Sequence, residues 1–426
     1  MKMVNLKNLN SILLIFIFFS TKANAYIDPG GISAFLQILF ASVVTSIIFL
    51  KSYISSFFKN IYNFFRDFQV FFKVLFLNEK TFIYCESNNY SIYFHEILKQ
   101  FKKNKKDFIY LCKSKDENIS KLNLEKETYI FNKNFFLLTL LSIIKCNNLI
   151  LTTPDFGNHK LKLSKRIKNI IYIFHSAVST NMIYNDKAFD NYNTICCVGN
   201  HHINELSEKF NVSGLKNKLI KCGYPYLDYL IASANKENYL KKNILFAPSW
   251  YPDNPNYYDD NYTLLISEII KNNFKIIFRP HPEYFKRFEK EFLKFTKNFS
   301  DTSNFIVNTD KSNYLSMEQS EFLITDWSGI AFEFAYAFKR PVIFVNSPKK
   351  ILNKNFSKSK LTPIEISDRE EIGVIFNNDS NKVNIVDLLI KIENDKNIYL
   401  NKIEQNLNKN IFNIGSSSSI IESNLI

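Results

Sequence analysis

The groups best suited to chemistry lie in a short turn between two apolar runs. Phe322–Ile324 and Val342–Val345 are each typical of a buried strand, and apolar residues return at helical spacing from Ile330. The turn before Ile330 contains Ser328 and Gly329, whose backbone N–H groups would therefore lie at a helix N-terminus. An anion binds well at such a position, because the open N–H groups and the helix dipole both favour negative charge. The sequence therefore predicts a phosphate site at Ser328 and Gly329.

Two carboxylates flank this turn. Asp326 lies directly before it, and beside a phosphate-binding helix start a carboxylate is better suited to capping the turn than to acid–base or metal chemistry. Glu333 lies one turn into the helix, where it could accept hydrogen bonds from a ribose or stabilise the first helical turn. Both residues are candidates for the same anion-binding site.

A second turn, upstream, carries a cation and an imidazole. The apolar strand Lys275–Phe278 ends in Arg279 and His281, each followed by a proline that restricts the backbone. Arginine is rare in this lysine-rich chain, so its use here suggests bidentate recognition of a phosphate; the alternative is a surface loop with an incidental ion pair. Ser249 ends the strand Ile244–Ala247 and could contact the same ligand, because ligands of open α/β sheets bind beyond the carboxyl ends of strands.

One more histidine follows a predicted strand. His175 comes directly after Ile170–Phe174, and a neutral imidazole there could take a proton from a hydroxyl that attacks a phosphate ester. The alternative is a capping or structural histidine. His175 and His281 are thus the catalytic candidates, whereas His201 and His202 are expected to be structural, because adjacent side chains on a helix do not converge. No Asp-x-Asp, His-x-x-x-His or paired-carboxylate spacing is present, so no metal or other cofactor is predicted.

Taken together, these turns resemble the CDP-glycerol glycerophosphotransferase family, of the teichoic-acid polymerase type. The resemblance rests on Arg279–Pro282 and Thr325–Phe334, with Ala247–Trp250 and Gly223–Asp228, and covers roughly residues 80 to 425. It implies the glycosyltransferase-B (GT-B) arrangement of two Rossmann-like domains. It also implies transfer of an alditol phosphate, most simply glycerol phosphate, from a CDP-linked donor to an acceptor hydroxyl with release of CMP. By resemblance, His175 occupies the position of the family's catalytic base.

The elements that would position these residues alternate along the chain. Strand-like and helical patterns follow one another from Thr81, which predicts an α/β fold with parallel sheets. We expect a Rossmann-like acceptor domain over residues 81–235 and a Rossmann-like nucleotide-donor domain over residues 236–382, with Lys218–Tyr226 crossing between them. Residues 383–426 are expected to form a helical segment and tail. The opening turn has no Gly-x-Gly-x-x-Gly pattern, so no dinucleotide is expected.

The N-terminal region has the pattern of a membrane segment. Residues 1–25 resemble a signal peptide or a first membrane segment, with the apolar core Ile12–Phe19. Residues 26–50 are predicted to be a transmembrane helix, because they contain a charge-free apolar stretch long enough to span the hydrocarbon core. Residues 51–80 are basic and aromatic, which predicts an interfacial helix on an anionic leaflet; a helix packed on the globular domain is the equal alternative. The basic residues after the span place the catalytic domain in the cytoplasm, at the inner membrane.

The composition indicates which classes of binding partner are expected. The 426 residues carry a net charge of +14, but lysine is spread throughout and no nucleic-acid module is present, which favours anionic lipids and phosphorylated substrates. The six cysteines lack metal-ligand spacing, as in a protein of a reducing compartment. The expected partners are a nucleotide-diphosphate-linked donor, an envelope glycan or lipid-linked acceptor, and the membrane. Two alternatives remain: a nucleotide-sugar glycosyltransferase on the same scaffold, and a non-catalytic membrane scaffold for envelope assembly.

Overall fold

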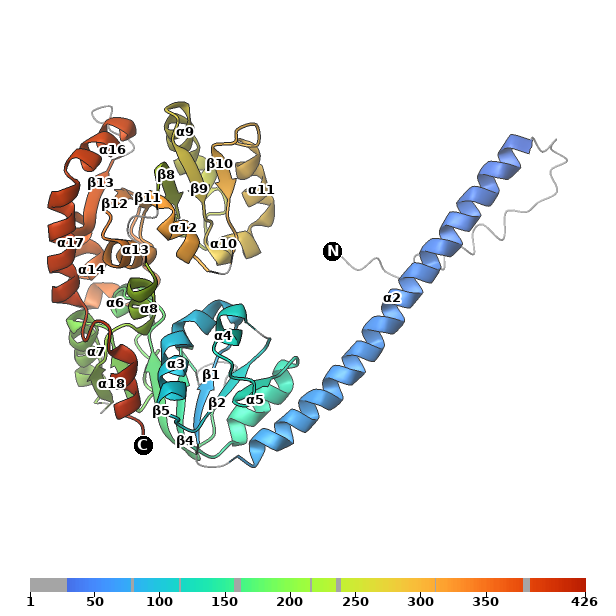
Figure 1. Ribbon diagram of the computed structural model, residues 1–426, viewed down its shortest axis with the longest axis horizontal. Helices are drawn as coiled ribbons and strands as arrows, with labels where there is room; N and C mark the ends of the chain where they lie inside the picture. The colour runs from blue at the N-terminus through green and yellow to red at the C-terminus, as the bar shows by residue number, and fades with distance from the viewer. Residues whose placement is uncertain are drawn as a thin grey trace. The chain divides into compact units, whose positions relative to one another are not determined.

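The protein forms two compact units, which comprise residues 1–65 and 66–426 (Figure 1). The predicted signal segment, residues 1–25, lies outside the residues that the structure describes. In this computed structural model the described residues are 29–77, 80–114, 116–156, 162–214, 217–234, 239–310, 312–377 and 384–426.

The second unit contains two sheets, and every recorded strand pair in both is parallel. The first sheet has the order β3-β2-β1-β4-β5-β6-β7 and the second has the order β10-β9-β8-β11-β12-β13. The strands of the first sheet are β1 (Thr81–Tyr84), β2 (Phe108–Cys112), β3 (Thr128–Ile130), β4 (Cys146–Leu151), β5 (Ile167–Ile173), β6 (Thr194–Cys197) and β7 (Lys218–Lys221). Those of the second are β8 (Leu240–Phe246), β9 (Lys275–Phe278), β10 (Phe305–Val307), β11 (Ser320–Thr325), β12 (Val342–Val345) and β13 (Gly373–Phe376).

Helices cover these sheets and connect their strands (Figure 1). Around the first sheet lie η1 (Asn88–Phe94), α3 (His95–Lys103), α4 (Glu117–Ser120), α5 (Asn134–Ile143), α6 (Thr180–Ile183), α7 (Asn200–Ser213) and α8 (Pro225–Ser233). Those of the second sheet are α9 (Tyr257–Lys271), α10 (Pro282–Arg287), α11 (Glu289–Lys297), α12 (Tyr314–Glu318), α13 (Ile330–Phe338), η2 (Phe356–Lys358), α14 (Ile364–Ser367) and α15 (Arg369–Ile372). The chain ends with α16 (Ile385–Asn394), α17 (Lys396–Asn410) and α18 (Ser417–Ser423).

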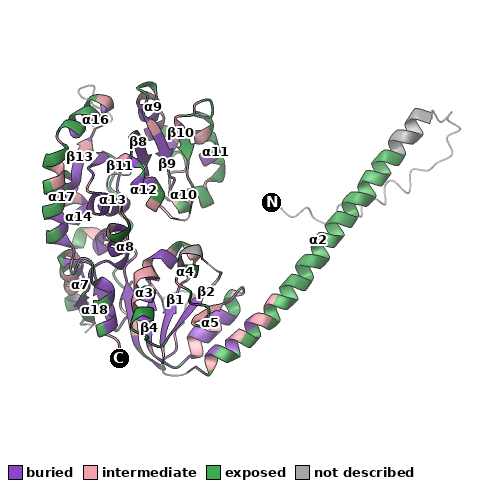
Figure 2. Ribbon diagram, in the orientation of Figure 1, coloured by how far each residue is buried: buried purple, intermediate pink, exposed green. Residues whose placement is uncertain are grey.

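This architecture confirms the predicted α/β fold with two Rossmann-like sheets. The central strands are buried along their length, as the continuous apolar runs indicated (Figure 2). Two edge strands, β7 and β13, were not predicted. Lys218–Lys221 was expected to be part of the crossover, but it pairs with β6, and only Ile220 of its four residues is buried. An edge strand with one buried residue has too weak an apolar pattern to be recognised from the sequence.

The two sheets share one apolar cluster, which contains side chains from β1 and β4 as well as from β11 and β12. Helices α8 and α13 pack against each other within it. The end of the chain returns to the first sheet, because Phe412 donates its N–H to the carbonyl of Val198 (2.9 Å) and α18 packs against α3. The sheets are therefore joined both by the chain between β7 and β8 and by the C-terminal helices.

The N-terminal helix α2 (Pro29–Leu75) is continuous through both predicted segments, residues 26–50 and 51–80. No glycine or proline occurs between Gly31 and Leu75, so nothing in the sequence breaks the helix at residue 50. Among the described residues, α2 contains the one helix stretch, Leu36–Leu75, that is long and apolar enough to cross a membrane. From Leu36 to Phe65 nearly all its side chains are exposed (Figure 2).

The last turns of α2 belong to the second unit and pack on its first sheet. Phe71 and Val74 are buried, and the Phe71 ring lies 6.1 Å from that of Phe136 on α5. Asp67 is fully buried, where it accepts hydrogen bonds from Asn132 Nδ2 (2.9 Å) and from the N–H of Lys133 (2.7 Å) just before α5. This part of the helix thus follows the alternative of a helix packed on the globular domain.

Asp67→Ala should lower the free energy of unfolding by about 1–3 kcal/mol, because the fully buried carboxylate accepts two hydrogen bonds that tie the helix to the segment before α5. Asp107, whose side chain is 86% exposed in its ion pair with Lys80, provides the matched control. Asp107→Ala should change stability by no more than about 0.5 kcal/mol. Urea denaturation of the detergent-solubilised full chain measures both values, and equal losses would contradict the assigned role of Asp67.

Candidate active site

His175 lies at the carboxyl end of β5 in an aromatic pocket. Its ring centroid is 5.2 Å from that of Tyr90, 5.9 Å from Tyr93 and 6.4 Å from Tyr184. Burial lowers the pKa of His175 to about 4, although a hydrogen bond with the Thr152 backbone acts in the opposite direction. Its Nδ1 atom is buried and has no hydrogen-bond partner among the described residues. The imidazole is therefore neutral at pH 7 and has a ring nitrogen that can take part in proton transfer.

The loop after His175 contacts the predicted phosphate turn directly. Gly329 is the N-cap residue of α13, and a Cβ atom at this position would lie 2.4 Å from Ser176 Oγ and 3.1 Å from Val178 Cγ1. The backbone of Gly329 has φ −62°, which any residue can adopt, so only this close approach requires glycine. The structure therefore brings His175, which follows β5, into the neighbourhood of Ser328 and Gly329, which follow β11 of the other sheet.

Two buried carboxylates hold this loop in place. Glu205 on α7 accepts hydrogen bonds from Ser179 Oγ (2.7 Å) and from the N–H of Thr180 (2.6 Å). Glu365 on α14 accepts the N–H of Ser179 at 3.1 and 3.0 Å, so it links the loop to the second sheet's side of the molecule. Burial raises the pKa of Glu365 to about 8, and the hydrogen bond from the N–H of Ser179 acts in the opposite direction.

His201 and His202 support the same loop. His201 Nε2 bonds the carbonyl of Ala177 and His202 Nε2 bonds that of Val178, both at 2.8 Å. The His202 ring also packs on Phe174, with centroids 3.9 Å apart. These contacts fit the structural role that their position indicated.

Asp326 ties the ends of two strands together. It is 1% exposed, and its Oδ1 accepts hydrogen bonds from the N–H groups of Ser249 (2.8 Å) and Trp327 (2.6 Å) while Oδ2 accepts from the Tyr262 hydroxyl (3.0 Å). Both carboxylate oxygens are therefore engaged by the protein. This matches the capping function weighed from the sequence and makes Asp326 a positioning residue for the turn.

Arg369 is a second support of the turn, and no local sequence pattern predicts it. Its guanidinium lies 4.1 Å from the centroid of the Trp327 ring and donates to the carbonyl of Asp326 (3.1 Å). Trp327 is 8% exposed and bonds the carbonyl of Ser347 through Nε1 (3.1 Å). The indole is thus part of the scaffold behind Ser328 and Gly329.

The first turn of α13 offers open donors. Among the described residues, the amide N–H groups of Ser328 and Gly329 donate to no recorded acceptor, and both residues are partly exposed. The carbonyls of the same two residues accept from Ala331 and Phe332, which closes the first helical turn. This is the geometry that favours an anion at a helix N-terminus.

Arg279 is held by the neighbouring strand end. Its Nη1 donates to Asn308 Oδ1 (2.6 Å) and its Nη2 to the carbonyl of Asp310 (2.5 Å). The guanidinium is close enough to Tyr93 and Tyr226 to lower their pKa values, which burial raises. Tyr93 also lines the pocket of His175, so Arg279 and His175 lie beside the same aromatic wall.

His281 is the N-cap residue of α10. Its Nδ1 accepts the N–H of Glu283 (3.2 Å), which leaves Nε2 as the protonated, donating nitrogen of the neutral ring. Burial, with the nearby Lys350 ammonium, lowers the pKa of His281 to about 3. The charge of Asp326 raises the pKa of Lys350, so this lysine lies near the predicted phosphate turn. Lys350 was not among the predicted site residues. Lys350 lies in the loop after β12, where no local sequence pattern distinguishes it from other lysines.

The two remaining candidates are buried. Ser249 is 0% exposed, and its Oγ has no hydrogen-bond partner among the described residues. Glu333 is 6% exposed and accepts from the Tyr224 hydroxyl (2.9 Å) and from Asn313 Nδ2 (3.5 Å). Burial raises the pKa of Glu333 to about 7. Glu333 therefore connects α13 to Tyr224, which precedes α8. This contact goes beyond stabilisation of the first helical turn, which was one of the two roles considered from the sequence.

Asp155 and Phe156 follow β4, where Phe156 packs on Tyr192, while residues 157–159 of the same segment lie outside the described residues. Within the described ranges no three His, Cys, Asp or Glu side chains gather as metal ligands. The six cysteines are all buried and unpaired.

The two parallel sheets and their helices define a GT-B-like fold, which solved structures share. The wall teichoic acid polymerase TagF matches with a TM-score of 0.52 at 15% identity, over 81% of this chain and 88% of that one. The UDP-GlcNAc 2-epimerase of Methanocaldococcus jannaschii matches with a TM-score of 0.51 at 14% identity, over 81% and 98% of the two chains. At these identities the likeness concerns the fold.

The sequence itself identifies the family. A family model described as CDP-Glycerol:Poly(glycerophosphate) glycerophosphotransferase matches residues 67–355, and the chain belongs to this family of transferases. The minor teichoic acid biosynthesis protein GgaB of Bacillus subtilis is 28% identical over 165 residues. That match covers 33% of this chain and spans 17% of the relative's length.

The contact between the two halves of the site can be tested by a double-mutant cycle. Gly329→Ala should destabilise the fold by about 1–3 kcal/mol, because its methyl group would meet Ser176 Oγ in a packed interface. Ser176→Ala removes that oxygen and should recover about 0.5 kcal/mol or more of the loss in the double variant. Urea denaturation of the four proteins gives the coupling energy. Strict additivity would mean that residues 176 and 329 do not touch.

Proposed function

We propose that this protein is a membrane-associated transferase of cell-envelope polysaccharide or glycolipid synthesis. It moves glycerol phosphate, or a related alditol phosphate, from a CDP-linked donor to an acceptor hydroxyl, and CMP leaves. The observation that carries the proposal is the contact of Ser176 with Gly329, which sets a neutral histidine beside an open helix N-terminus. Family membership supports the same chemistry.

The donor diphosphate lies at the start of α13 in this proposal. The N–H groups of Ser328 and Gly329 bind its oxygens, and Arg279 and Lys350 supply positive charge in a partly desolvated site. His281 donates through Nε2, because its Nδ1 is occupied by the helix cap. Such fixed donors stabilise charge that develops on a phosphoryl group without reorganising during the reaction.

Ser249 and Glu333 complete the donor side. Ser249 Oγ, buried without a protein partner, donates to a phosphate oxygen. Glu333 accepts from a ribose hydroxyl with the oxygen that binds Asn313 only weakly, at 3.5 Å. Asp326 contributes indirectly, by holding Ser249 and Trp327. Residues 236–382 thus form the donor domain of the proposal.

The acceptor lies against residues 81–235, with its reacting hydroxyl at His175. The imidazole takes the hydroxyl proton while the acceptor oxygen bonds to the phosphorus that carries the alditol. The bond from that phosphorus to the bridging oxygen breaks, and CMP leaves with the electron pair. A buried imidazole with a pKa of about 4 is fully deprotonated at pH 7, and the charge of a bound diphosphate raises its basicity.

Helix α2 anchors the enzyme to the inner membrane, with the catalytic part in the cytoplasm. Its exposed apolar side chains support insertion, and Lys51, Lys59 and Arg66 follow the apolar stretch as the positive-inside rule expects. The last turns of the helix, from Asp67, are fixed to α5. The C-terminal segment 383–426 links the two catalytic domains and takes no part in the chemistry.

His175→Gln should reduce the transfer rate by about 10²–10⁴-fold while leaving donor affinity nearly unchanged, because it removes only the proton acceptor. For the unmodified enzyme, protonation of His175 should lower kcat/KM only below about pH 5, and a change near pH 7 would report Glu333 of the donor side, whose pKa is about 7. Release of CMP from CDP-glycerol measures the rate, and binding of CDP measures affinity. A parallel loss of both in the variant would count against a base.

Arg279→Ala and Ser328→Ala should weaken CDP binding, because they remove a guanidinium and a side-chain hydroxyl that donate to the diphosphate alongside the backbone N–H groups. The arginine change removes a charge-assisted hydrogen bond, which corresponds to roughly a 10- to 100-fold loss of affinity. Arg166 is exposed at the start of β5, on the opposite edge of the first sheet, and Arg166→Ala serves as the control with unchanged affinity. Equal affinities in all these variants would remove Arg279 and Ser328 from the donor site.

A further inference from the structure

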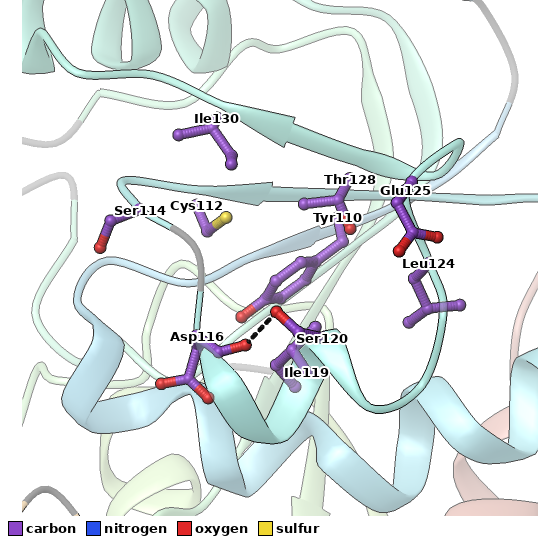
Figure 3. Close-up of a pocket in the computed structure, with 10 residues that line it drawn as sticks. All are labelled: Tyr110, Cys112, Ser114, Asp116, Ile119, Ser120, Leu124, Glu125, Thr128 and Ile130. Atoms are coloured by element: carbon purple, nitrogen blue, oxygen red, sulfur yellow. Dashed lines mark hydrogen bonds between the residues drawn. The ribbon is translucent and has the colours of Figure 1, made fainter.

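A cavity of about 210 Å³ lies at the carboxyl end of β2, apart from the residues described above (Figure 3). Ten residues of β2, β3, α4 and the segments beside them line it: Tyr110, Cys112, Ser114, Asp116, Ile119, Ser120, Leu124, Glu125, Thr128 and Ile130. None of the ten belongs to the His175 cluster or to the phosphate turn. The volume equals that of about seven liquid water molecules, so a small molecule or one unit of a polymer would fill it.

The cavity contains a polar group that the protein satisfies only weakly. Tyr110 is 1% exposed, and its hydroxyl points into the cavity, where its one recorded partner among the described residues is the thiol of Cys85, a weak acceptor (Figure 3). That thiol itself donates to the carbonyl of Ser87 (3.0 Å). A buried hydroxyl with only a weak partner costs free energy, so its position is consistent with a ligand that bonds to it. Burial raises the pKa of Tyr110, which keeps the hydroxyl a neutral donor.

The lining selects a class of ligand. Asp116 and Glu125 bring carboxylates, while Ser114, Ser120 and Thr128 bring hydroxyls, and none of the ten lining residues is basic. A phosphate or carboxylate would therefore meet negative charge without compensation. Apolar groups, Ile119, Leu124, Ile130 and the Tyr110 ring, lie among these polar ones around the cavity (Figure 3). A lining that mixes oxygen atoms with apolar side chains suits a sugar ring or a short polyol, which itself combines hydroxyl groups with C–H groups.

We infer that this cavity is a binding site for one uncharged sugar or polyol unit. Because the sheet is parallel, the cavity and His175 share its carboxyl edge, separated by three strand spacings or about 15 Å. Between them lie Glu86 after β1 and Thr153 after β4, joined by a hydrogen bond of 2.5 Å. The cavity would thus hold a unit of the acceptor remote from the reacting hydroxyl. That assignment to the acceptor rests on the proposed function, whereas the binding itself does not.

Saturation-transfer NMR on the full chain, in a detergent whose head group carries no sugar, tests the inference without donor or turnover. The probes are N-acetyl-D-glucosamine, glycerol, ethanolamine and inorganic phosphate. At least one of the two uncharged probes should bind, and Tyr110→Phe should weaken it roughly three- to tenfold, the effect of one lost hydrogen bond. Ser120→Leu, which adds volume at an exposed residue of the cavity lining, should abolish binding.

Tyr172→Phe is the matched control, because the Tyr172 hydroxyl is also buried but lies on β5 beside Tyr184, outside this cavity. It should leave sugar or glycerol binding unchanged. The inference is overturned if the binding of both uncharged probes is absent or is unaffected by the changes at Tyr110 and Ser120. It is also overturned if these two changes weaken the binding of ethanolamine or phosphate instead. If the unmodified protein binds sugar or glycerol in this way but has no transferase activity, the proposed function alone is refuted.

Discussion

The site depends on one close approach, in which the loop after β5 lies against the N-terminus of α13. Ser176 and Gly329 come from different sheets, and the gap between them admits no side chain at position 329. Glu205 and Glu365 hold the loop from behind, through buried hydrogen bonds to the backbone and hydroxyls of Ser179 and Thr180. Breaking a buried network of this kind leaves several polar groups unpaired, so the loop has a single stable arrangement.

Burial also determines which groups are charged. The pKa values of His175 and His281 fall to about 4 and 3, so both imidazoles are neutral near pH 7. The cationic side chains of the candidate site are Arg279, whose guanidinium stays protonated in proteins, and Lys350, whose pKa burial lowers while the charge of Asp326 raises it. In the proposed mechanism the neutral imidazoles would serve proton transfer and hydrogen bonding, and these side chains would face the phosphates.

The sequence was sufficient for the fold and for placing the candidate site residues at the ends of strands. Continuous apolar runs predicted the central strands, and a turn with Ser328 and Gly329 before an apolar helical pattern predicted the phosphate turn. It was insufficient where contacts join distant segments. Lys350 and Arg369 lie in stretches without a distinctive pattern, and only the folded chain places Arg369 on Trp327. The pairing of Ser176 with Gly329 is likewise a property of packing between sheets. The continuity of α2 could have been inferred, because its sequence lacks a helix breaker.

The most direct test is the ionisation of His175 with and without a bound nucleotide diphosphate. Histidine-selective ¹⁵N NMR of the full chain, with the His175 signal assigned by its absence in His175→Gln, gives the pKa in both states. The account predicts a value near 4 in the free protein. It predicts a rise of about one to two units when CDP is bound, since a phosphate a few ångströms away favours the charged imidazole. A His175 pKa that stays unchanged while CDP demonstrably binds would contradict the account, because the imidazole would then not face the phosphate site.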